Sequence, residues 1–373
     1  MTSPRATTAQ RARLAARRRA VVRLAARERA HLAVITRRQD VSYLSGFTGE
    51  DSWLLVGRGW ARLITDGRFG EQAPQECPGV EIDVRQGVSL AAATAAAIKG
   101  RKIRRLAVQT AMPLGDHDQL ARAMGARTIV PAAGLLAGRM VKDAGELKAI
   151  VHAVRIAEKA FRQLIAGGVK ELAGKTERQI AAKLEYLMRA AGADGAAFPT
   201  IVAGGPNASR CHHTPGDRKT RRGEGLLLDF GALAAGYHSD LTRVVFLGTI
   251  PRTLGRAYEV VRRAQQAGIR AVGPGVLCNR PDGVARGIIA QAGFGPAFVH
   301  GLGHGLGREV HEAPGLGSKA AGRLRAGMVV TVEPGVYLPG VGGIRIEDDV
   351  VVTASGRRRL SALPTEINAM LLR

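Results

Sequence analysis

The sequence DFGALAAGYHSD, residues 229–240, places two aspartates at the borders of apolar runs. LLL precedes Asp229 and LTRVVFLG follows Asp240, so we expect both side chains to lie in strands that are otherwise buried. An ionised carboxylate in such a place costs several kcal/mol unless a positive group meets it. We therefore expect arginines or bound metal ions near these two residues.

Later stretches of the chain carry further acidic and histidine side chains in similar surroundings. Glu333 and Glu347 lie in runs of β-branched residues, and His304 is expected in a loop whose glycines let the backbone approach closely. The stretches are VHGLGHGLGREVHEAPG (299–315), VVTVEPGVY (329–337) and GGIRIEDDVVVT (342–353).

Four carboxylates and one imidazole could converge in a core only if cations held them together. Two divalent ions carry four positive charges, which would balance the four carboxylates, so the set predicts a site for two metal ions. An oxygen-rich set with one imidazole suits Mn²⁺ best, and Co²⁺, Fe²⁺ and Zn²⁺ remain open.

Two further residues are placed to orient the ligands. Thr242 lies two residues after Asp240, and Arg345 lies two residues before Glu347. Because side chains alternate along a strand, each would share a face with its neighbour and could hold a ligand from behind.

The length and composition indicate a folded protein of two domains. The chain has 373 residues, of which 46% are hydrophobic, and this length exceeds that of one ordinary core. Its three distant cysteines fit neither a disulfide framework nor a zinc finger, and a reducing cytoplasm suits them best. No apolar run reaches the ~20 residues that a membrane span needs, so we expect no membrane partner.

The net charge of +24 raises the question of nucleic-acid binding. Of the basic residues 45 are Arg and 10 are Lys, in a chain rich in Ala and Gly, which is typical of codon bias in a G+C-rich genome. Aromatic residues that could stack on bases are not interleaved with the charges, so we do not expect specific nucleic-acid binding. Residues 1–30 hold nine Arg and one Glu. They are interpreted as a solvated first helix, with a targeting peptide as the alternative.

The order of apolar segments predicts two different domains. Short stretches at 31–36, 52–57 and 61–67, followed by an Ala-rich helix near 89–99, indicate a small α/β domain. VPAAGLLAGRMV (130–141) is interpreted as a connector. Asp143 and Glu146 then form a capping box at the start of an amphipathic helix.

From residue 143 onward the pattern of helices and strands occurs twice. Helices near 143–165 and 176–191 precede the strands of Asp229 and Asp240. Helices near 254–272 and 281–292 precede the strands of Glu333 and Glu347. This duplication indicates two half-domains that face each other, and a cleft between such halves is a common place for a site.

Taken in order, these motifs resemble the aminopeptidase P and prolidase branch of the pita-bread-fold metallopeptidases. The motifs are FPTIVAGGPNASRCHHTPGDRK, LLLDFGALAAGYHSDLTR, HGLGHGLGREVHEAP, VEPGVY and GGIRIEDDVVV, and they cover about residues 140–365. DVSYLSGFTGE and TDGRF resemble the creatinase-like N-terminal domain of this branch. The resemblance implies an α/β N-terminal domain over 1–135 and an α+β pita-bread catalytic domain with a pseudo-twofold repeat over 143–373.

The resemblance also implies the chemistry. It places two divalent metal ions on Asp229, Asp240, His304, Glu333 and Glu347. It further places His212, His300 and His311 around a peptide substrate, with Glu333 as the base in the hydrolysis of Xaa-Pro bonds, by an aminopeptidase or a dipeptidase. His213 is adjacent to His212; spacing to Asp217 favours His212, and the choice between them stays open.

Three alternatives are weighed against this reading. A methionine-aminopeptidase-like exopeptidase would use the same ligands, but such chains usually lack a domain like residues 1–135. A creatinase-type enzyme has two domains but does without the metals, which the intact set of five ligands argues against. A non-enzymatic interaction or nucleic-acid-binding relative would typically have lost ligands. The sequence leaves open whether the chain forms a homodimer.

Overall fold

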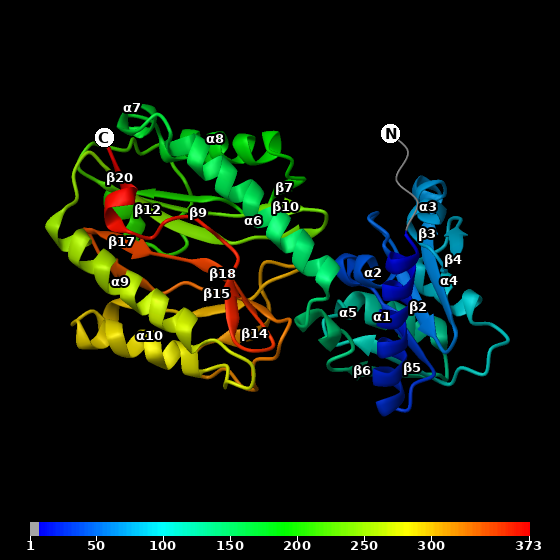
Figure 1. Cartoon of the computed structure of the whole chain (residues 1–373). Helices are drawn as coiled ribbons and strands as arrows, with labels where there is room; N and C mark the ends of the chain where they lie inside the picture. Colours follow the sequence, from blue (N-terminus) through cyan, green and yellow to red (C-terminus); the bar gives the residue numbers. More distant parts are fainter. Residues whose placement is uncertain (1–6) are drawn as a thin grey trace. The chain divides into compact units, whose positions relative to one another are not determined.

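The computed structural model describes residues 7–373, which form two compact units with the boundary between Gly138 and Arg139. Figure 1 shows the helices and strands of each unit. Among the described residues, no helix combines the length and the apolar character needed to cross a membrane.

The first unit is built on a six-stranded mixed sheet in the order β4-β3-β2-β1-β5-β6. Its central strand β1 pairs antiparallel with β2 and parallel with β5. The three stretches predicted as strands form β1, β2 and β3, so those predictions are confirmed. The strands are β1 (Leu32–Ile35), β2 (Trp53–Gly57), β3 (Trp60–Asp66), β4 (Glu81–Arg85), β5 (Arg105–Gln109) and β6 (Thr128–Ala132).

The side chains of β1 alternate between the two faces of the sheet, and each face has its own hydrophobic cluster. Ala33 and Ile35 belong to one buried cluster, which includes Val21 of helix α1. Leu32 and Val34 belong to the other, which includes residues of helix α4. The helices of the unit are α1 (Thr8–Arg27), α2 (Arg38–Ser45), α3 (Gln72–Glu76), α4 (Leu90–Ala97) and α5 (Leu114–Met124).

Two details of this unit bear on the sequence predictions. The arginine-rich N-terminus forms α1 from Thr8 onward, with Leu14, Val21 and Ala25 buried, so a first helix is confirmed over the described residues. Residues 130–141 are only partly a connector, because Thr128–Ala132 forms β6 against β5. This strand was not predicted, because it is short and contains Pro131, which is tolerated at a sheet edge.

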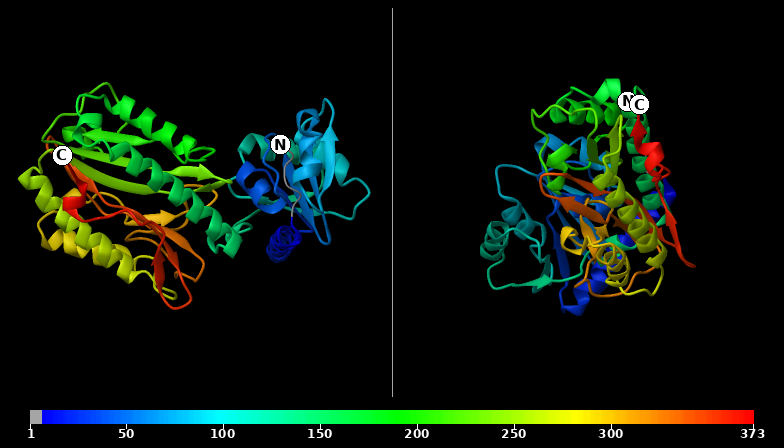
Figure 2. Two further views of the ribbon diagram at one scale, coloured as in Figure 1. Left: turned by 45° about the horizontal axis from the view of Figure 1, so that its top comes forward. Right: turned by 90° about the vertical axis from the view of Figure 1, so that its left-hand side faces the viewer.

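The second unit shows the predicted repeat of two helices followed by strands, and the strands of each half form an antiparallel pair. In the first half, α6 (Ala144–Ile165) and α8 (Glu177–Ala190) precede β9 (Gly225–Phe230) and β12 (Leu241–Leu247). In the second half, α9 (Arg252–Ala271) and α10 (Arg280–Gln291) precede β15 (Val329–Val332) and β18 (Asp348–Val352). Helices α9 and α10 lie side by side in the views of Figures 1 and 2. This is the α+β pita-bread arrangement.

Local sequence explains where these helices begin. The capping box of Asp143 and Glu146 is present at the start of α6, and Thr176 with Gln179 forms a second one at the start of α8. Each satisfies backbone N–H groups that a helix leaves unpaired at its first turn. The short helix α7 (Val169–Leu172) lies between them.

The described strands of the second unit form a four-stranded, a five-stranded, a three-stranded and a two-stranded sheet. The two larger sheets have the orders β20-β12-β9-β8 and β14-β13-β15-β18-β19, and β16 pairs with β17. One large hydrophobic cluster lies among these strands and the four long helices. The remaining strands are β7 (Gly195–Ala196), β8 (Ile201–Gly204), β10 (Ala232–Ala234), β11 (Tyr237–His238), β13 (Gly303–Gly305), β14 (Glu312–Leu316), β16 (Gly335–Leu338), β17 (Gly342–Arg345), β19 (Arg357–Arg359) and β20 (Leu371–Leu372).

Candidate metal centre

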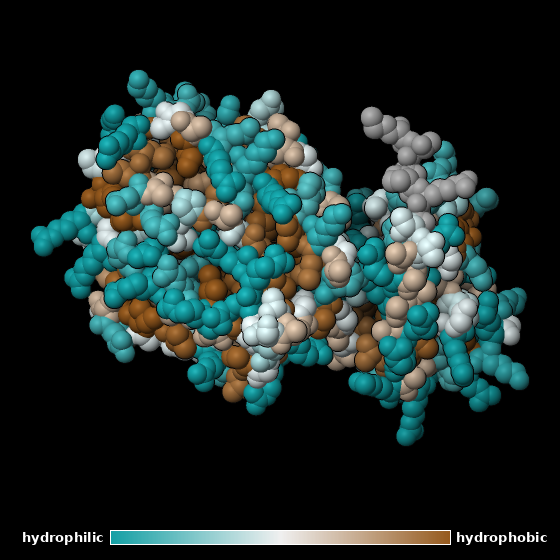
Figure 3. All heavy atoms as spheres, viewed as in Figure 1, coloured by the Kyte–Doolittle hydropathy of each residue, from teal (hydrophilic) through white to brown (hydrophobic). Residues whose placement is uncertain are grey.

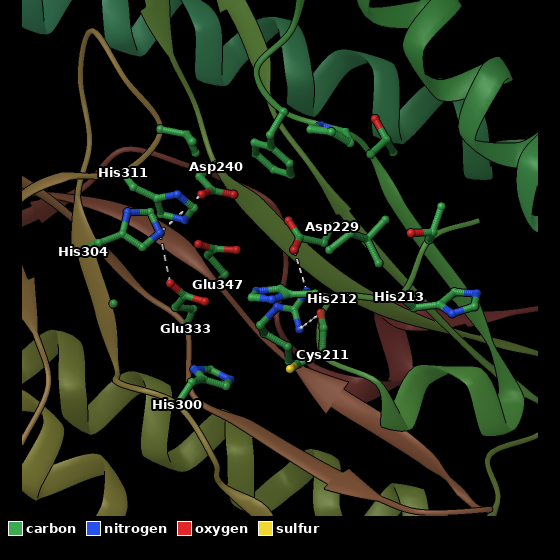
Figure 4. A pocket seen from close by; sticks show the side chains of 18 of the residues that line it. Cys211, His212, His213, Asp229, Asp240, His300, His304, His311, Glu333 and Glu347 are labelled. Carbon is green, nitrogen blue, oxygen red and sulfur yellow. Dashed lines mark hydrogen bonds and ion pairs between the residues drawn. The ribbon is translucent and has the colours of Figure 1, made fainter. Parts of the chain in front are cut away.

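The five predicted ligands lie around one cavity of the second unit, with a volume of about 520 Å³. Figure 4 shows their side chains directed toward a common space from both halves of the unit. His212, His300, His311 and Arg345 line the same cavity. The residues that line it include Asp229, Asp240, His304, Glu333 and Glu347.

The carboxylates occupy the ends of strands more often than their interiors. Asp229 lies within β9, as predicted, but Asp240 precedes β12 by one residue. Glu333 follows β15, and Glu347 lies in the two-residue interval between β17 and β18. At these positions the backbone still bonds across the site, because Glu347 N donates to Thr242 O at 3.2 Å and Glu333 N donates to Leu302 O at 2.8 Å.

His304 lies in a short strand, β13, and the prediction of a loop is wrong at this residue. The predicted close approach is present on both sides of it. A Cβ on Gly303 would lie 2.2 Å from Thr331 O, and one on Gly305 would lie 2.5 Å from Ala313 O. Glycine is therefore required for β13 to fit between β14 and β15. The backbone N of His304 donates to Thr331 Oγ1 at 3.1 Å.

Three of the five predicted ligands come within the range of a single metal ion. One ligand atom each from Asp240, His304 and Glu347 lies within 4.8 Å of the others. His304 Nε2 is 3.6 Å from Asp240 Oδ2 and 3.2 Å from Glu333 Oε1.

The predicted supporting residues, Thr242 and Arg345, contact two of the proposed ligands. Thr242 Oγ1 donates to Glu347 Oε2 at 2.7 Å and accepts from Arg345 Nε at 3.1 Å. Arg345 Nη2 forms an ion pair with Asp229 Oδ2. Thr242 and Asp229 are also register partners across β12 and β9. One arginine and one hydroxyl therefore fix a ligand from each half of the unit.

The site has more buried negative charge than its own side chains neutralise. Burial raises the pKa of Asp240 and of Glu347 well above the ordinary range, and the neighbouring carboxylates raise it further. Among the described residues, Asp229 Oδ1 and Glu347 Oε1 are buried without a hydrogen-bond partner. Unpaired buried carboxylate oxygens are what a cation would coordinate, so the residues present fit a divalent metal ion.

The histidines expected around the substrate do not have identical surroundings. His300 Nε2 lies 2.8 Å from the hydroxyl of Tyr337, which also accepts from Arg345 Nη1 at 2.7 Å. The rings of His304 and His311 have centroids 4.3 Å apart. Burial lowers the pKa of His300 and of His311, so both are held toward the neutral form that can donate one hydrogen bond.

Other residues of the site were not singled out from the sequence. Tyr337 belongs to the quoted motif VVTVEPGVY, but its bridge between His300 and Arg345 depends on a partner on another strand. Asp349 accepts a hydrogen bond from Asp240 N at 3.1 Å. His238 contacts Gly307 O at 3.1 Å and does not line the cavity, in keeping with the structural role expected of it.

Family models match both parts of the chain. The model of metallopeptidase family M24 matches residues 148–354, which include all five predicted ligands. The chain belongs to metallopeptidase family M24. A creatinase/prolidase N-terminal domain model matches residues 17–141. Membership of this family makes the chain a metal-dependent peptidase.

Individual M24 relatives resemble the chain over most of its length. An uncharacterized peptidase from Bacillus subtilis is 38% identical over 339 residues, which are 90% of this chain and 94% of the relative. A Xaa-Pro dipeptidase from Pyrococcus horikoshii is 37% identical over 267 residues, or 71% of this chain and 75% of the relative.

Solved structures of M24 peptidases share the whole fold. A Xaa-Pro dipeptidase from Bacillus anthracis superposes with a TM-score of 0.91 at 31% identity and covers 96% of this chain and 100% of its own. An X-Pro aminopeptidase from Thermotoga maritima gives 0.86 at 36% identity, with coverage of 94% and 99%.

Proposed function

We propose that this M24 peptidase hydrolyses the bond between an N-terminal residue and a following proline. It would act as an aminopeptidase or as a dipeptidase. The convergence of four carboxylates and His304 in one cavity, with buried carboxylate oxygens left unpaired, is the observation that carries the proposal. The names of the Pyrococcus horikoshii and Thermotoga maritima relatives support the choice of proline substrates. A tertiary amide before proline has no N–H, so recognition must use the ring and the free amino end.

The proposed ligands are Asp229, Asp240, His304, Glu333 and Glu347, for two divalent ions, with Mn²⁺ as the native metal. The donor set has one imidazole, and its remaining atoms are carboxylate oxygens, which suits Mn²⁺ better than metals that prefer thiolates. Bound divalent ions polarise a carbonyl and make water acidic enough to ionise near neutral pH.

The side chains of the cavity supply the proton transfer and the hydrogen bonds. Glu333 would accept the proton of the attacking water at its carboxylate and pass it to the leaving nitrogen. His212 and His311 would donate hydrogen bonds to the oxygen that becomes negative, and His300 would contact the substrate from the Tyr337 side. Arg345 is already bonded to Asp229, so its role is to hold that ligand.

Hydrolysis of a matched set of peptides tests the proposal. Ala-Pro and Ala-Pro-Ala distinguish a dipeptidase from an aminopeptidase, and Ala-Ala and Met-Ala-Ala serve as controls without an Xaa-Pro bond. Each is assayed in the chelated protein and after addition of Mn²⁺, Co²⁺ or Zn²⁺. Cleavage of Met-Ala-Ala in place of the proline peptides would indicate a methionine-aminopeptidase-like enzyme, and cleavage of none would contradict peptidase action on such substrates.

We propose a reducing compartment, the cytoplasm, as its location. Cys77, Cys211 and Cys278 are free thiols in the described structure, and two of them are buried. Sedimentation at micromolar concentration distinguishes the monomer from the homodimer that the sequence leaves open.

A further inference from the structure

The segment that carries His212 to the cavity is a loop with little regular structure. It leaves β8 at Gly204, passes through a short 3-10 helix (Gly205–Ser209), and places Cys211, His212 and His213 on the cavity wall. In Figure 4, His212 lies beside Asp229, whereas His213 lies farther from the carboxylates. A loop of this kind needs contacts outside itself to hold a histidine in one place.

Those contacts converge on Glu177, the first residue of α8. Its side chain is fully buried, at 0% exposure. One carboxylate oxygen accepts from Gly204 N and from Asn207 Nδ2, both at 2.9 Å. The other lies 2.8 Å from His213 Nε2 and accepts from Gly216 N at 3.2 Å. The four partners include both ends of the loop.

The carboxylate is held in its ionised form. Burial alone would raise the pKa of Glu177, but the hydrogen bonds from Gly204, His213 and Asn207 outweigh burial and lower the pKa below its ordinary value. A carboxylate that accepts several N–H groups is a strong anchor, because each of these bonds is charge-assisted.

The same loop also contacts the machinery around the proposed ligands. Cys211 O accepts a hydrogen bond from Arg345 Nη1 at 3.3 Å, and Arg345 is the ion-pair partner of Asp229. His212 itself lines the same cavity as His300 and His311. A shift of the loop would therefore move His212 and loosen Arg345 together.

We propose that Glu177 is a positioning residue, which anchors the loop 204–216 so that His212 faces the substrate, and that His213 is part of this anchor and does not contact substrate. The proposal rests on the proposed function, because it gives His212 its role there. It also decides between the two adjacent histidines, which the sequence left open.

A buried carboxylate can stabilise a fold without affecting a site, so a matched control is needed. Glu158 of α6 is also buried, and its Oε1 accepts from the backbone N of Ala362 and of Leu363, the latter at 3.1 Å. It anchors a loop whose residues do not line the cavity. Glu158→Gln therefore removes a comparable anchor away from the site.

Kinetics of a double-mutant cycle test whether Glu177 acts through His212. Glu177→Gln should lower kcat on the cleaved proline peptide by about tenfold or more, because small displacements of a catalytic group are costly. In the His212→Ala background the same change should cost several-fold less, because the group it positions is gone and only the loosened contact to Arg345 remains. Equal losses in both backgrounds would overturn the proposal. Glu158→Gln should lower the melting temperature without changing kcat.

His213 provides a second variant in case Glu177→Gln does not fold. His213→Ala removes one of the four partners of Glu177 and should lower kcat by a smaller factor than His212→Ala does. If His213→Ala is the more damaging of the two, His213 and not His212 faces the substrate, and the proposal is wrong.

The reactivity of Cys211 reports on the loop without any substrate. Cys211 is half-buried, whereas burial raises the pKa of Cys77 to about 12 and also raises that of Cys278. A thiol reagent at pH 8 should therefore label Cys211 first. Glu177→Gln should speed this labelling several-fold, and Glu158→Gln should not. An unchanged rate in Glu177→Gln would refute the anchor, even if no proline peptide proves to be a substrate.

Discussion

The hydroxyl of Thr242 donates a hydrogen bond to Glu347 across 105 positions of sequence, at 2.7 Å. The same oxygen accepts from Arg345, so one buried threonine links a proposed ligand to the arginine that pairs with Asp229. Groups that orient ligands in this way tune a metal site nearly as strongly as the ligands do.

Replacement of Thr242 by valine should therefore weaken metal binding while the fold is kept. Loss of such a supporting contact typically costs 10–100-fold in affinity, and we expect a weakening of about tenfold for Mn²⁺. Calorimetric titration of the chelated protein measures it. Thr65→Val is the matched control, because the hydroxyl of Thr65 is buried in the first unit without a partner among the described residues. Equal affinities in wild type and Thr242→Val would contradict the role of the hydroxyl.

Removal of metal should lower both activity and thermal stability. The proposed ligands would be left as a cluster of buried carboxylates, in which burial and mutual repulsion already raise the pKa of Asp240 and of Glu347. Chelation should abolish hydrolysis and reduce the melting temperature, and Mn²⁺ should restore both. Calorimetric melting before and after dialysis against a chelator measures the change. Full activity in protein that elemental analysis shows to lack metal would contradict the proposed mechanism.

Glu333→Gln should keep the fold and lose turnover. The amide cannot accept the proton of water, and general-base catalysis typically contributes ~10²–10⁴-fold, so we expect kcat to fall at least about 100-fold. Steady-state kinetics at saturating Mn²⁺, with circular dichroism as the control for folding, separates the two effects. A variant that hydrolyses the proline peptide at nearly the wild-type rate would exclude Glu333 as the base.

The ionised state of Glu177 predicts how pH affects its contribution to stability. Its folded pKa lies below the ordinary value of 4.5, so its contribution is fully present above about pH 4.5 and is lost as the pH falls through the folded pKa. The difference in unfolding free energy between wild type and Glu177→Gln should therefore shrink as the pH falls below about 4.5. Urea titrations of both chelated proteins measure this difference, and a constant value down to pH 3 would mean that Glu177 is not the titrating anchor.

The arginines of α1 predict weak, nonspecific binding to DNA. Arg19, Arg23 and Arg27 are exposed one turn apart. Hydrophilic side chains also cover much of the face drawn in Figure 3. Phosphate contacts without base readout are insensitive to sequence and weaken steeply with salt.

Binding of a duplex by wild type should be lost near ~150 mM salt, and replacing these three arginines by glutamine should weaken it further at low salt. Peptidase activity should be unchanged, because none of the three lines the cavity. Fluorescence anisotropy with two unrelated duplexes makes the test. Nanomolar binding that prefers one of them would show that the basic surface has a specific partner.

The sequence by itself determined the elements and the set of proposed ligands. The capping box of Asp143 and Glu146 marked the start of α6, and apolar runs marked β1, β2, β3 and β9. These signals are local, because caps and periodicity depend on residues a few positions apart. The ligands could be predicted because a carboxylate within an apolar run is expected to be buried, and a buried carboxylate needs a positive partner.

Only the tertiary structure decided which groups meet. Glu177 gave no sign in the sequence beyond its place at a helix start, yet its partners His213 and Gly216 lie 36 and 39 positions away. Tyr337 of β16 likewise bridges His300, which precedes β13, and Arg345 of β17. A hydrogen bond needs its donor and acceptor within about 3 Å and in a favourable direction. For residues so far apart in the chain, the packing of helices and sheets sets that geometry, and no local sequence pattern encodes it.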